Sequence, residues 1–245
     1  MRLKLSLVLV AVLSACGTTY QLPELAAVQS ATATKMFAEA RSEGPRRQLS
    51  NSAAEQRFRH VASRVERAGS KYCVSLTADR QGFDCDVDLA IDRKMKVRNA
   101  YFTFDDGNPI IRISMPMLKD SASDDEVAFI LSHEYGHLIG RHIEKQEQQA
   151  IAGALILGAL TAVATDYDED LVEASLGIGA AVGSMAYSQS FELESDTLGA
   201  RITHSAGYDP VKGAKFFARP EKARTSAGNL SFWGTHPPDE KRLAI

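Results

Sequence analysis

Apolar residues recur at helical spacing between Val127 and Leu138, and this pattern predicts a helix that is buried along one side. The stretch Ser123-Asp124-Asp125-Glu126 precedes it and has the form of a capping box, in which Ser123 accepts from the amide of Glu126 and the glutamate side chain reaches back. Acidic residues in this first turn also favour the helix dipole. The helix is therefore expected to begin near residue 123. Its apolar side carries Val127, Ile130, Leu131 and Leu138.

Two further patterns predict another helix and a small sheet. Ser52-Ala53-Ala54-Glu55 has the form of a cap for a helix that ends near Gly69. Three strand-like runs follow, and the turn Asp105-Asp106-Gly107-Asn108 separates the last two, as expected of a small, mostly antiparallel sheet. The fold is therefore predicted to be α+β and mainly helical. The apolar positions are Phe58, Val61 and Val65 in the helix, and Val87, Leu89, Ile91, Ala100, Phe102, Phe104 and Ile110 to Met115 in the strands.

The segment between residues 150 and 186 is apolar in two runs. Ala150 to Ala164 holds fifteen residues without a charge, and the acidic break from Asp166 to Asp170 separates it from a glycine- and alanine-rich run, Leu171 to Ala186. Fifteen residues fall short of the ~20 that a membrane-spanning helix needs. We therefore expect a helical hairpin that covers the neighbouring helices, with partial membrane contact as the alternative.

The first sixteen residues have the pattern of a secretory signal. Arg2 and Lys4 precede an apolar run from Leu5 to Leu13, which is too short for a spanning helix. Leu13-Ser14-Ala15-Cys16 then resembles the lipobox of bacterial lipoproteins, so Cys16 is expected to become the lipidated first residue. A chance cysteine after an ordinary signal peptide is the alternative. The Gly17 that follows resembles a signal for sorting to the outer membrane, facing the periplasm.

The expected organisation is a signal peptide of residues 1–15, a lipid-anchored tether of residues 16–50 and one domain of residues 51–245. The tether is polar and alanine-rich, as expected of a segment with partial helix. About 230 mature residues with 44% hydrophobic composition suffice for one sizeable core. Loss of Arg2 and Lys4 with the signal takes the formal net charge from −3 to −5, which argues against nucleic-acid partners.

Cys73 and Cys85 are the two cysteines that remain after lipidation. In an oxidising periplasm they can form one disulfide around the turn Asp79-Arg80-Gln81-Gly82. Closing a loop of this length contributes about 3 kcal/mol by chain-entropy arguments. Zinc binding is the alternative, but neither cysteine belongs to a Cys-x-x-Cys pair, so the disulfide is expected.

His133-Glu134-Tyr135-Gly136-His137 carries the chemistry of the chain. Four residues of helix turn the chain by ~400°, so both imidazoles project from one face and can share a metal ion. Imidazole nitrogens suit Zn²⁺, and Glu134 is placed to take a proton from a water that the metal activates. The alternative, two histidines without a ligand, is weakened by the spacing, the intervening glutamate and the capped helix.

A catalytic zinc site usually has three protein ligands, so a third is required. His142 is a candidate, but it lies about 140° around an unbroken helix from His137 and is better explained as a helix-terminal histidine favoured by the dipole. Glu192 is the stronger candidate, because Asp196 follows it one helical turn later. Asp196 can then accept the free N–H of a ligating histidine. Glu194 is expected on the solvated face.

These features resemble the HtpX, CAAX prenyl protease and Oma-type zinc metallopeptidases, whose soluble core is a zincin fold called a minigluzincin. The resemblance spans roughly Ser52 to the end and includes bacterial periplasmic lipoproteins. It implies that His133, His137 and Glu192 bind one Zn²⁺ per chain, with Glu134 as general base. The motifs that carry it are His133 to His137, Glu192 to Asp196, Gly207-Tyr208-Asp209-Pro210, Asn99-Ala100-Tyr101, and Thr235-His236-Pro237 with Arg242.

The resemblance also implies roles for residues outside the metal motifs. The strand at Asn99-Ala100-Tyr101 is expected to hold substrate as an added strand, although it can equally be structural. His236 and Arg242 are candidates for stabilising the tetrahedral oxyanion. In some relatives the histidine equivalent to His236 is thought to cap the zinc and hold the enzyme latent.

The function expected from the sequence is a zinc metalloendopeptidase of the bacterial cell envelope that hydrolyses misfolded or unassembled envelope polypeptides. The alternative is a lipid-anchored assembly factor that uses the metal domain to bind peptides, with secondary or latent proteolysis. An intact Glu134 favours the enzyme, because a pure binding module has no need of a general base.

Overall fold

The computed structural model describes residues 17–24, 26–44, 46–185, 189–219, 226 and 231–244. The signal peptide and Cys16 therefore lie outside the described residues. The chain divides into two compact units, a larger one of residues 22–139 and 193–245 and a smaller one of residues 1–21 and 140–192. One boundary falls at the last residue of α5 (Asp124–Gly140), the helix that carries the HExxH motif, and another falls within helix α8 (Gln189–Ser205).

The larger unit has the expected α+β composition and is mainly helical. Its core includes the apolar side of the HExxH helix α5, where Val127, Ile130 and Leu131 are fully buried. Its elements are α2 (Ala27–Ser42), α3 (Asn51–Leu76), β1 (Asp88–Asp92), β2 (Ala100–Asp105), β3 (Asn108–Ser114), α4 (Met115–Asp120), α5 (Asp124–Gly140), most of α8, α9 (Pro210–Ala214), η1 (Lys215–Ala218), α10 (Phe232–Thr235) and η2 (Glu240–Leu243).

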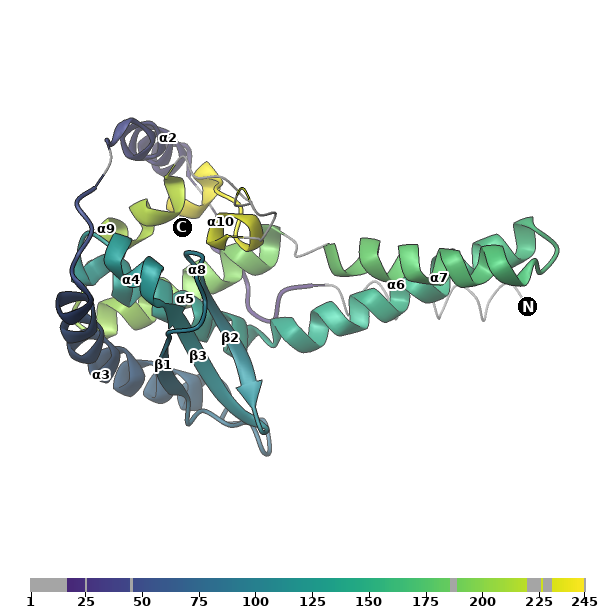
Figure 1. Cartoon of the computed structure of the whole chain (residues 1–245), viewed down its shortest axis with the longest axis horizontal. Coiled ribbons are helices and arrows are strands. Elements are labelled where there is room, and N and C mark those ends of the chain that lie inside the picture. The colour runs from purple at the N-terminus through teal and green to yellow at the C-terminus, as the bar shows by residue number, and fades with distance from the viewer. Residues whose placement is uncertain are drawn as a thin grey trace. The chain divides into compact units, whose positions relative to one another are not determined.

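The three strands form a mixed sheet in the order β1-β3-β2, with β3 in the middle (Figure 1). The hairpin between β2 and β3 is confirmed as antiparallel, and its turn places Asp106 and Gly107 at φ 50° and 85°, a geometry that glycine adopts readily. Strand β1 differs from expectation because it runs parallel to β3. Alternating apolar residues identify a strand but not its direction. Here the chain passes from β1 to the far side of β3 before it forms β2, and β1 ends up parallel to β3.

Helix α3 corrects two details of the sequence interpretation. Its N-cap is Ser50, whose hydroxyl accepts from the amide of Ala53 at 3.2 Å, so the cap lies two residues before Ser52. The helix also continues through Gly69 to Leu76. A Cβ atom at Gly69 would lie 2.7 Å from the Tyr135 ring, so this glycine permits close packing against α5 and does not end the helix.

The cap of α5 is confirmed. Ser123 accepts from the amide of Glu126 at 3.2 Å, and Glu126 in turn accepts from the amide of Ala122 at 2.7 Å. Glu126 also forms an ion pair with Arg46, which lies in the segment expected to be a tether. In that same segment Ala33 and Ala40 of α2 are buried.

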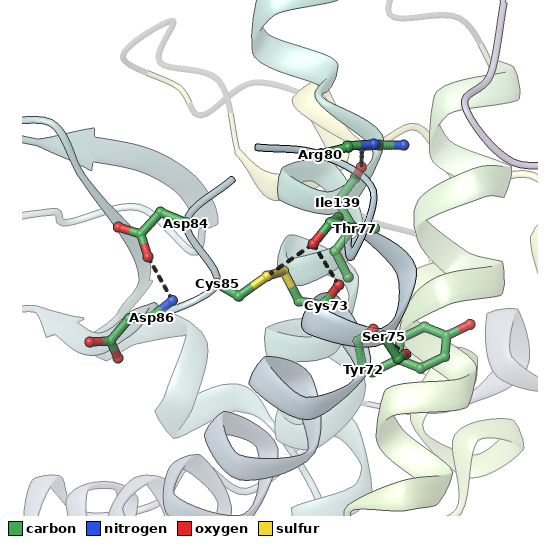
Figure 2. The surroundings of a disulfide bond; sticks show 9 residues. All are labelled: Tyr72, Cys73, Ser75, Thr77, Arg80, Asp84, Cys85, Asp86 and Ile139. Atoms are coloured by element: carbon green, nitrogen blue, oxygen red, sulfur yellow. Dashed lines mark hydrogen bonds between the residues drawn. A yellow bond between two sulfur atoms is a disulfide. The ribbon is translucent and has the colours of Figure 1, made fainter. Parts of the chain in front are cut away.

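Cys73 and Cys85 are joined across the loop between α3 and β1, with their Cα atoms 5.7 Å apart (Figure 2). Thr77 closes the end of α3 beside them, because its hydroxyl donates to the carbonyl of Cys73 at 2.9 Å and lies 3.5 Å from the sulfur of Cys85. From the same loop, Arg80 donates to the carbonyl of Ile139 at 3.3 Å. The crosslinked loop therefore supports the end of the HExxH helix.

The smaller unit consists of residues 17–21, the antiparallel pair α6 (His142–Ala164) and α7 (Glu169–Met185), and the start of α8. The expected helical hairpin is therefore present (Figure 1). Within the described residues, α6 is the one helix whose length and apolar composition would allow it to cross a membrane. Arg141, at φ 58°, separates α5 from α6, so His142 begins a new helix.

Candidate metal centre

Two glycines let helices α5 and α8 approach closely enough to build a site between them. A Cβ atom at Gly136, inside the HExxH motif, would lie 2.6 Å from the backbone of Ser195. From the other side, a Cβ atom at Gly199 would lie 2.9 Å from the backbone nitrogen of His133. Both contacts are with backbone, which cannot move aside as a flexible side chain can. This crossing brings the histidines of α5 against the acidic face of α8.

Asp196 on α8 orients the first histidine of the motif. Its Oδ1 lies 2.8 Å from Nδ1 of His133, which leaves Nε2 of that ring for a metal. Nε2 of His137 lies 3.0 Å from Nε2 of His133, so the two rings direct the same atom toward one point. Burial raises the pKa of Asp196, but the charge and hydrogen bonds of Arg242 and the bond to His133 outweigh it, so the pKa lies below its usual range.

Four buried side chains offer donor atoms to one position. The ligating atoms of His133, His137, Glu192 and His236 all lie within 4.8 Å of one another. Glu192 stands one turn before Asp196 on the continuous helix α8, so the spacing recognised in the sequence brings both carboxylates to this place. Three imidazoles and a carboxylate are the donor types that zinc prefers, and the group fits that metal.

Glu134 is fixed between the metal donors and the sheet. The backbone N–H of Phe102 in β2 donates to its Oε2 at 3.0 Å, and Nε2 of His236 lies 3.6 Å from its Oε1. The side chain is almost fully buried. A carboxylate held this way keeps one oxygen beside the metal donors, the position that a general base requires.

Aromatic rings fix His236 and Arg242 beside the site. Phe232 stacks on the His236 ring with centroids 4.4 Å apart and an interplanar angle of 17°. The Arg242 guanidinium lies over Phe217, 4.1 Å from the ring centroid. Arg242 also donates to the carbonyl of Pro237 at 3.3 Å, so it holds the turn after His236.

The structure gives Arg242 contacts that differ from those of an oxyanion donor. One edge of its guanidinium is directed at Asp196, with Nε 2.6 Å from Oδ2 and Nη2 2.9 Å from Oδ1. The carboxylate of Asp196 thus connects Arg242 to His133. His236, by contrast, lies among the donor atoms themselves.

His142 and Glu194 do not occupy the environments that the sequence suggested. His142 was expected at a helix C-terminus, but it begins α6, is fully buried and stacks on Phe191 with ring centroids 4.5 Å apart. The group of clustered donors consists of other residues, His133, His137, Glu192 and His236. Glu194 was expected on a solvated face, yet it is 1% exposed. Periodicity on one helix cannot reveal which neighbouring elements cover that face.

The segment Asn99-Ala100-Tyr101 lies at the start of the edge strand β2. The backbone N–H of Ser114 donates to the Asn99 carbonyl at 2.8 Å, and the Tyr101 hydroxyl donates to Asp92 at 2.8 Å. Burial and Asp92 raise the pKa of Tyr101 to about 12. Sequence reasoning missed Phe102, whose amide reaches Glu134. The alternation of the strand could have indicated it, because residues two apart in a strand, such as Ala100 and Phe102, have the same orientation.

Residues 55–245 match peptidase family M48. The beta-barrel assembly-enhancing protease of Escherichia coli K12 is 27% identical over 154 residues, which cover 58% of this chain and 30% of that protein. The mitochondrial metalloendopeptidase OMA1 of Schizosaccharomyces pombe is 28% identical over 130 residues, covering 53% of this chain and 36% of its own length. OMA1 of Arabidopsis thaliana is 30% identical over 130 residues, which cover 53% of this chain and 25% of that protein. The chain thus spans about a third of the length of these relatives, or less. Since the family match covers most of the chain and includes the metal donors, the chain belongs to peptidase family M48, a family of zinc metallopeptidases.

Proposed function

We propose that this chain is a zinc metalloendopeptidase of the bacterial cell envelope, acting on misfolded or unassembled envelope polypeptides. The observation that carries the proposal is the juxtaposition of four metal donors with Glu134. A site that only bound metal for stability would have no use for a buried carboxylate beside the ligands. The family and the relatives named as proteases support the same activity.

In this proposal His133, His137 and Glu192 hold the zinc ion, and Asp196 and Arg242 orient His133. Bound zinc supplies Lewis-acid activation of a water molecule and of the scissile carbonyl. Glu134 accepts the proton of that water and later delivers it to the leaving amine. The amide of Phe102 keeps the carboxylate of Glu134 aimed at the site while it does so.

The substrate is proposed to bind as an extra strand along β2. This strand is an edge of the sheet, and its alternate amides point away from β3, as the bond from Phe102 to Glu134 indicates. An extended peptide on this edge would place its backbone beside the general base. Main-chain hydrogen bonds depend little on the side chains of the substrate, which suits a protease that recognises unfolded polypeptides.

His236 is proposed to keep the enzyme latent in the state described here. Its ring nitrogen is one of the four clustered donors and lies 3.6 Å from Glu134, where a water would have to stand. Stacking on Phe232 stabilises this position. Once the ring has moved aside, His236 is proposed to stabilise the oxyanion of the tetrahedral intermediate.

The location is proposed to be the outer membrane facing the periplasm, through a lipidated Cys16. The lipobox-like stretch supports this anchor. A cysteine that carries more than one acyl chain is held stably in a membrane, whereas a single chain binds only marginally. A disulfide between Cys73 and Cys85 agrees with an oxidising compartment. The relatives named for beta-barrel assembly point to the same envelope setting.

A second function, favoured by the position of His236, is an assembly factor that binds polypeptides while proteolysis is held latent. The test is cleavage of unfolded casein by the full mature chain, measured with zinc, after chelation, and after zinc is restored. Cleavage that follows the metal supports the protease. Binding of the unfolded chain without cleavage, even with zinc and with His236→Ala, would favour the assembly factor.

A further inference from the structure

The α6–α7 hairpin packs through small residues and leaves most of its large apolar side chains outside. Between residues 150 and 181, the buried positions are Gly158, Ser175 and Gly179. A Cβ atom at Gly158 would lie 2.5 Å from the Leu176 side chain, and one at Gly179 would lie 2.3 Å from the carbonyl oxygen of Gly153. Helices that approach through glycine leave their larger side chains on the outer surface.

That outer surface is strongly apolar. Twelve large hydrophobic side chains are exposed in the described part of the chain, and nine of them lie between residues 151 and 178. Leu155, Leu160 and Val163 are 64%, 63% and 78% exposed. A helix pair that folds in water buries such side chains in its seam, whereas small residues in the seam and large ones outside are the arrangement of helices surrounded by lipid.

The N-terminal segment is attached to the base of this hairpin. Lys145 of α6 donates to the carbonyl of Gly17 at 2.9 Å and to the hydroxyl of Thr19 at 2.7 Å. Thr19 itself donates to the carbonyl of Gly140 at 2.9 Å. Gly17 directly follows Cys16, so acyl chains on that cysteine would enter the membrane next to α6. An anchor at this point brings the apolar hairpin to lipid and not to solvent.

We infer that the α6–α7 hairpin is a second membrane-binding element, which lies along the surface of a lipid bilayer with its large apolar side chains among the acyl chains. The attachment beside the anchor rests on the proposed lipidation of Cys16, but the affinity of the hairpin for lipid does not. The occupant of the exposed surface is therefore the bilayer itself.

The hairpin lies in one leaflet and does not span. The uncharged stretch Ala150–Ala164 is about 22 Å long at 1.5 Å per residue, shorter than the ~30 Å hydrocarbon core. An upright hairpin would bring the acidic tip, Asp166 to Asp170, into hydrocarbon, where ionised carboxylates are strongly disfavoured. Lying flat, the tip and Glu173 stay at the headgroups. These negative charges favour zwitterionic lipid over anionic lipid.

Binding is measured by flotation of the full mature chain carrying Cys16→Ser, which removes the acyl chains, with phosphatidylcholine vesicles. The chain should float with the vesicles, and Leu155→Gln with Leu160→Gln should lower the partition coefficient by about a hundredfold, roughly tenfold for each leucine removed from lipid. The matched control replaces Val74 and Val211 by glutamine, since these are 57% and 54% exposed on the larger unit. The control should change partitioning less than about twofold, and 1 M salt should not release the chain.

Depth is measured on the same background with single cysteines. An environment-sensitive label at Val163→Cys should shift to shorter wavelength on vesicles, while Asp168→Cys should stay reactive toward a membrane-impermeant maleimide added outside. Protection of Asp168→Cys would overturn the flat arrangement in favour of a spanning one. Absence of flotation, or equal loss in the control, would overturn the inference.

A second copy of the chain is the competing occupant of this surface. Sedimentation velocity showing a dimer that is lost with Leu155→Gln and Leu160→Gln, without any vesicle binding, would assign the surface to self-association and overturn the inference. Casein cleavage and acylation of Cys16 are measured separately in the chain with its natural Cys16. Failure of either one would contradict the proposed function while leaving the flotation result unaffected.

Discussion

Arg242 binds Asp196 through two parallel contacts, Nε to Oδ2 at 2.6 Å and Nη2 to Oδ1 at 2.9 Å. Asp196 in turn lies 2.8 Å from Nδ1 of His133. Because Arg242 holds Asp196, and Asp196 contacts Nδ1 of His133, the other ring nitrogen of His133, Nε2, is directed at the metal position. Residues from the C-terminal end of the chain therefore decide how a ligand on α5 is oriented.

Replacing Arg242 by lysine should weaken zinc binding. Lysine keeps the charge but cannot offer two donors in one plane, so Asp196 loses its fixed orientation. We expect a loss of zinc affinity of about 10- to 100-fold, measured by competition with a chelator. Arg201→Lys, an exposed position on α8, the helix that carries Asp196, is the control and should leave the zinc affinity unchanged. Unchanged zinc affinity in Arg242→Lys would contradict the orienting role.

Glu134→Gln should separate metal binding from catalysis. The amide oxygen can still accept from Phe102, but the amide cannot take a proton from water. Zinc content should stay near one ion per chain, while casein cleavage should fall about a thousandfold or more. Glu66→Gln, an exposed change on α3, should keep full activity. Undiminished turnover in Glu134→Gln would refute the assignment of the base.

Glu192→Ala and His142→Ala should have opposite effects on zinc and on folding. Glu192 is one of the clustered donors, so its loss should remove most of the zinc measured by atomic absorption. His142 is buried against Phe191 outside the donor group, so its loss should lower the melting temperature and leave the metal content near one per chain. The reverse pattern would replace Glu192 by His142 as the third ligand.

His236→Ala should raise the rate of casein cleavage if this residue keeps the enzyme latent. Removing the ring frees the position beside Glu134, from which it is 3.6 Å away. Phe232→Leu removes the stacked ring that holds His236 and should raise the rate in the same direction, by a smaller factor. A loss of activity in His236→Ala, with zinc retained, would instead assign His236 to the stabilisation of the oxyanion.

The cysteines should fall into two classes. Cys16→Ser should abolish acylation, measured by mass spectrometry of the mature N-terminus, because the thiol is the acceptor of the lipid. Cys73→Ser should leave acylation intact, expose one free thiol at Cys85, and lower the free energy of unfolding by about 3 kcal/mol. An unmodified N-terminus beginning elsewhere in the wild-type chain would contradict the lipoprotein prediction and leave the zinc site unaffected.

Local spacing determined much of what the sequence predicts about this protein. The cap at Ser123, the pairing of His133 with His137, the turn at Asp106-Gly107 and the spacing of Glu192 and Asp196 each depend on residues within about one turn of each other. Interactions of this range follow from backbone geometry alone. The sequence therefore predicts the HExxH helix, the β2–β3 hairpin and the best third ligand.

Tertiary structure decided the features that join distant segments. Phe102 is 32 residues from Glu134, and Arg242 is 46 residues from Asp196, so no local pattern could pair them. Helix α3 continues through Gly69 because Tyr135 packs there, and β1 is parallel to β3 because of the path of the chain. The apolar hairpin shows the same limit. Its composition is evident in the sequence, but only the packing of Gly158 and Gly179 in the seam leaves the leucines outside, since hydrophobicity alone does not say which side of a helix faces its neighbour.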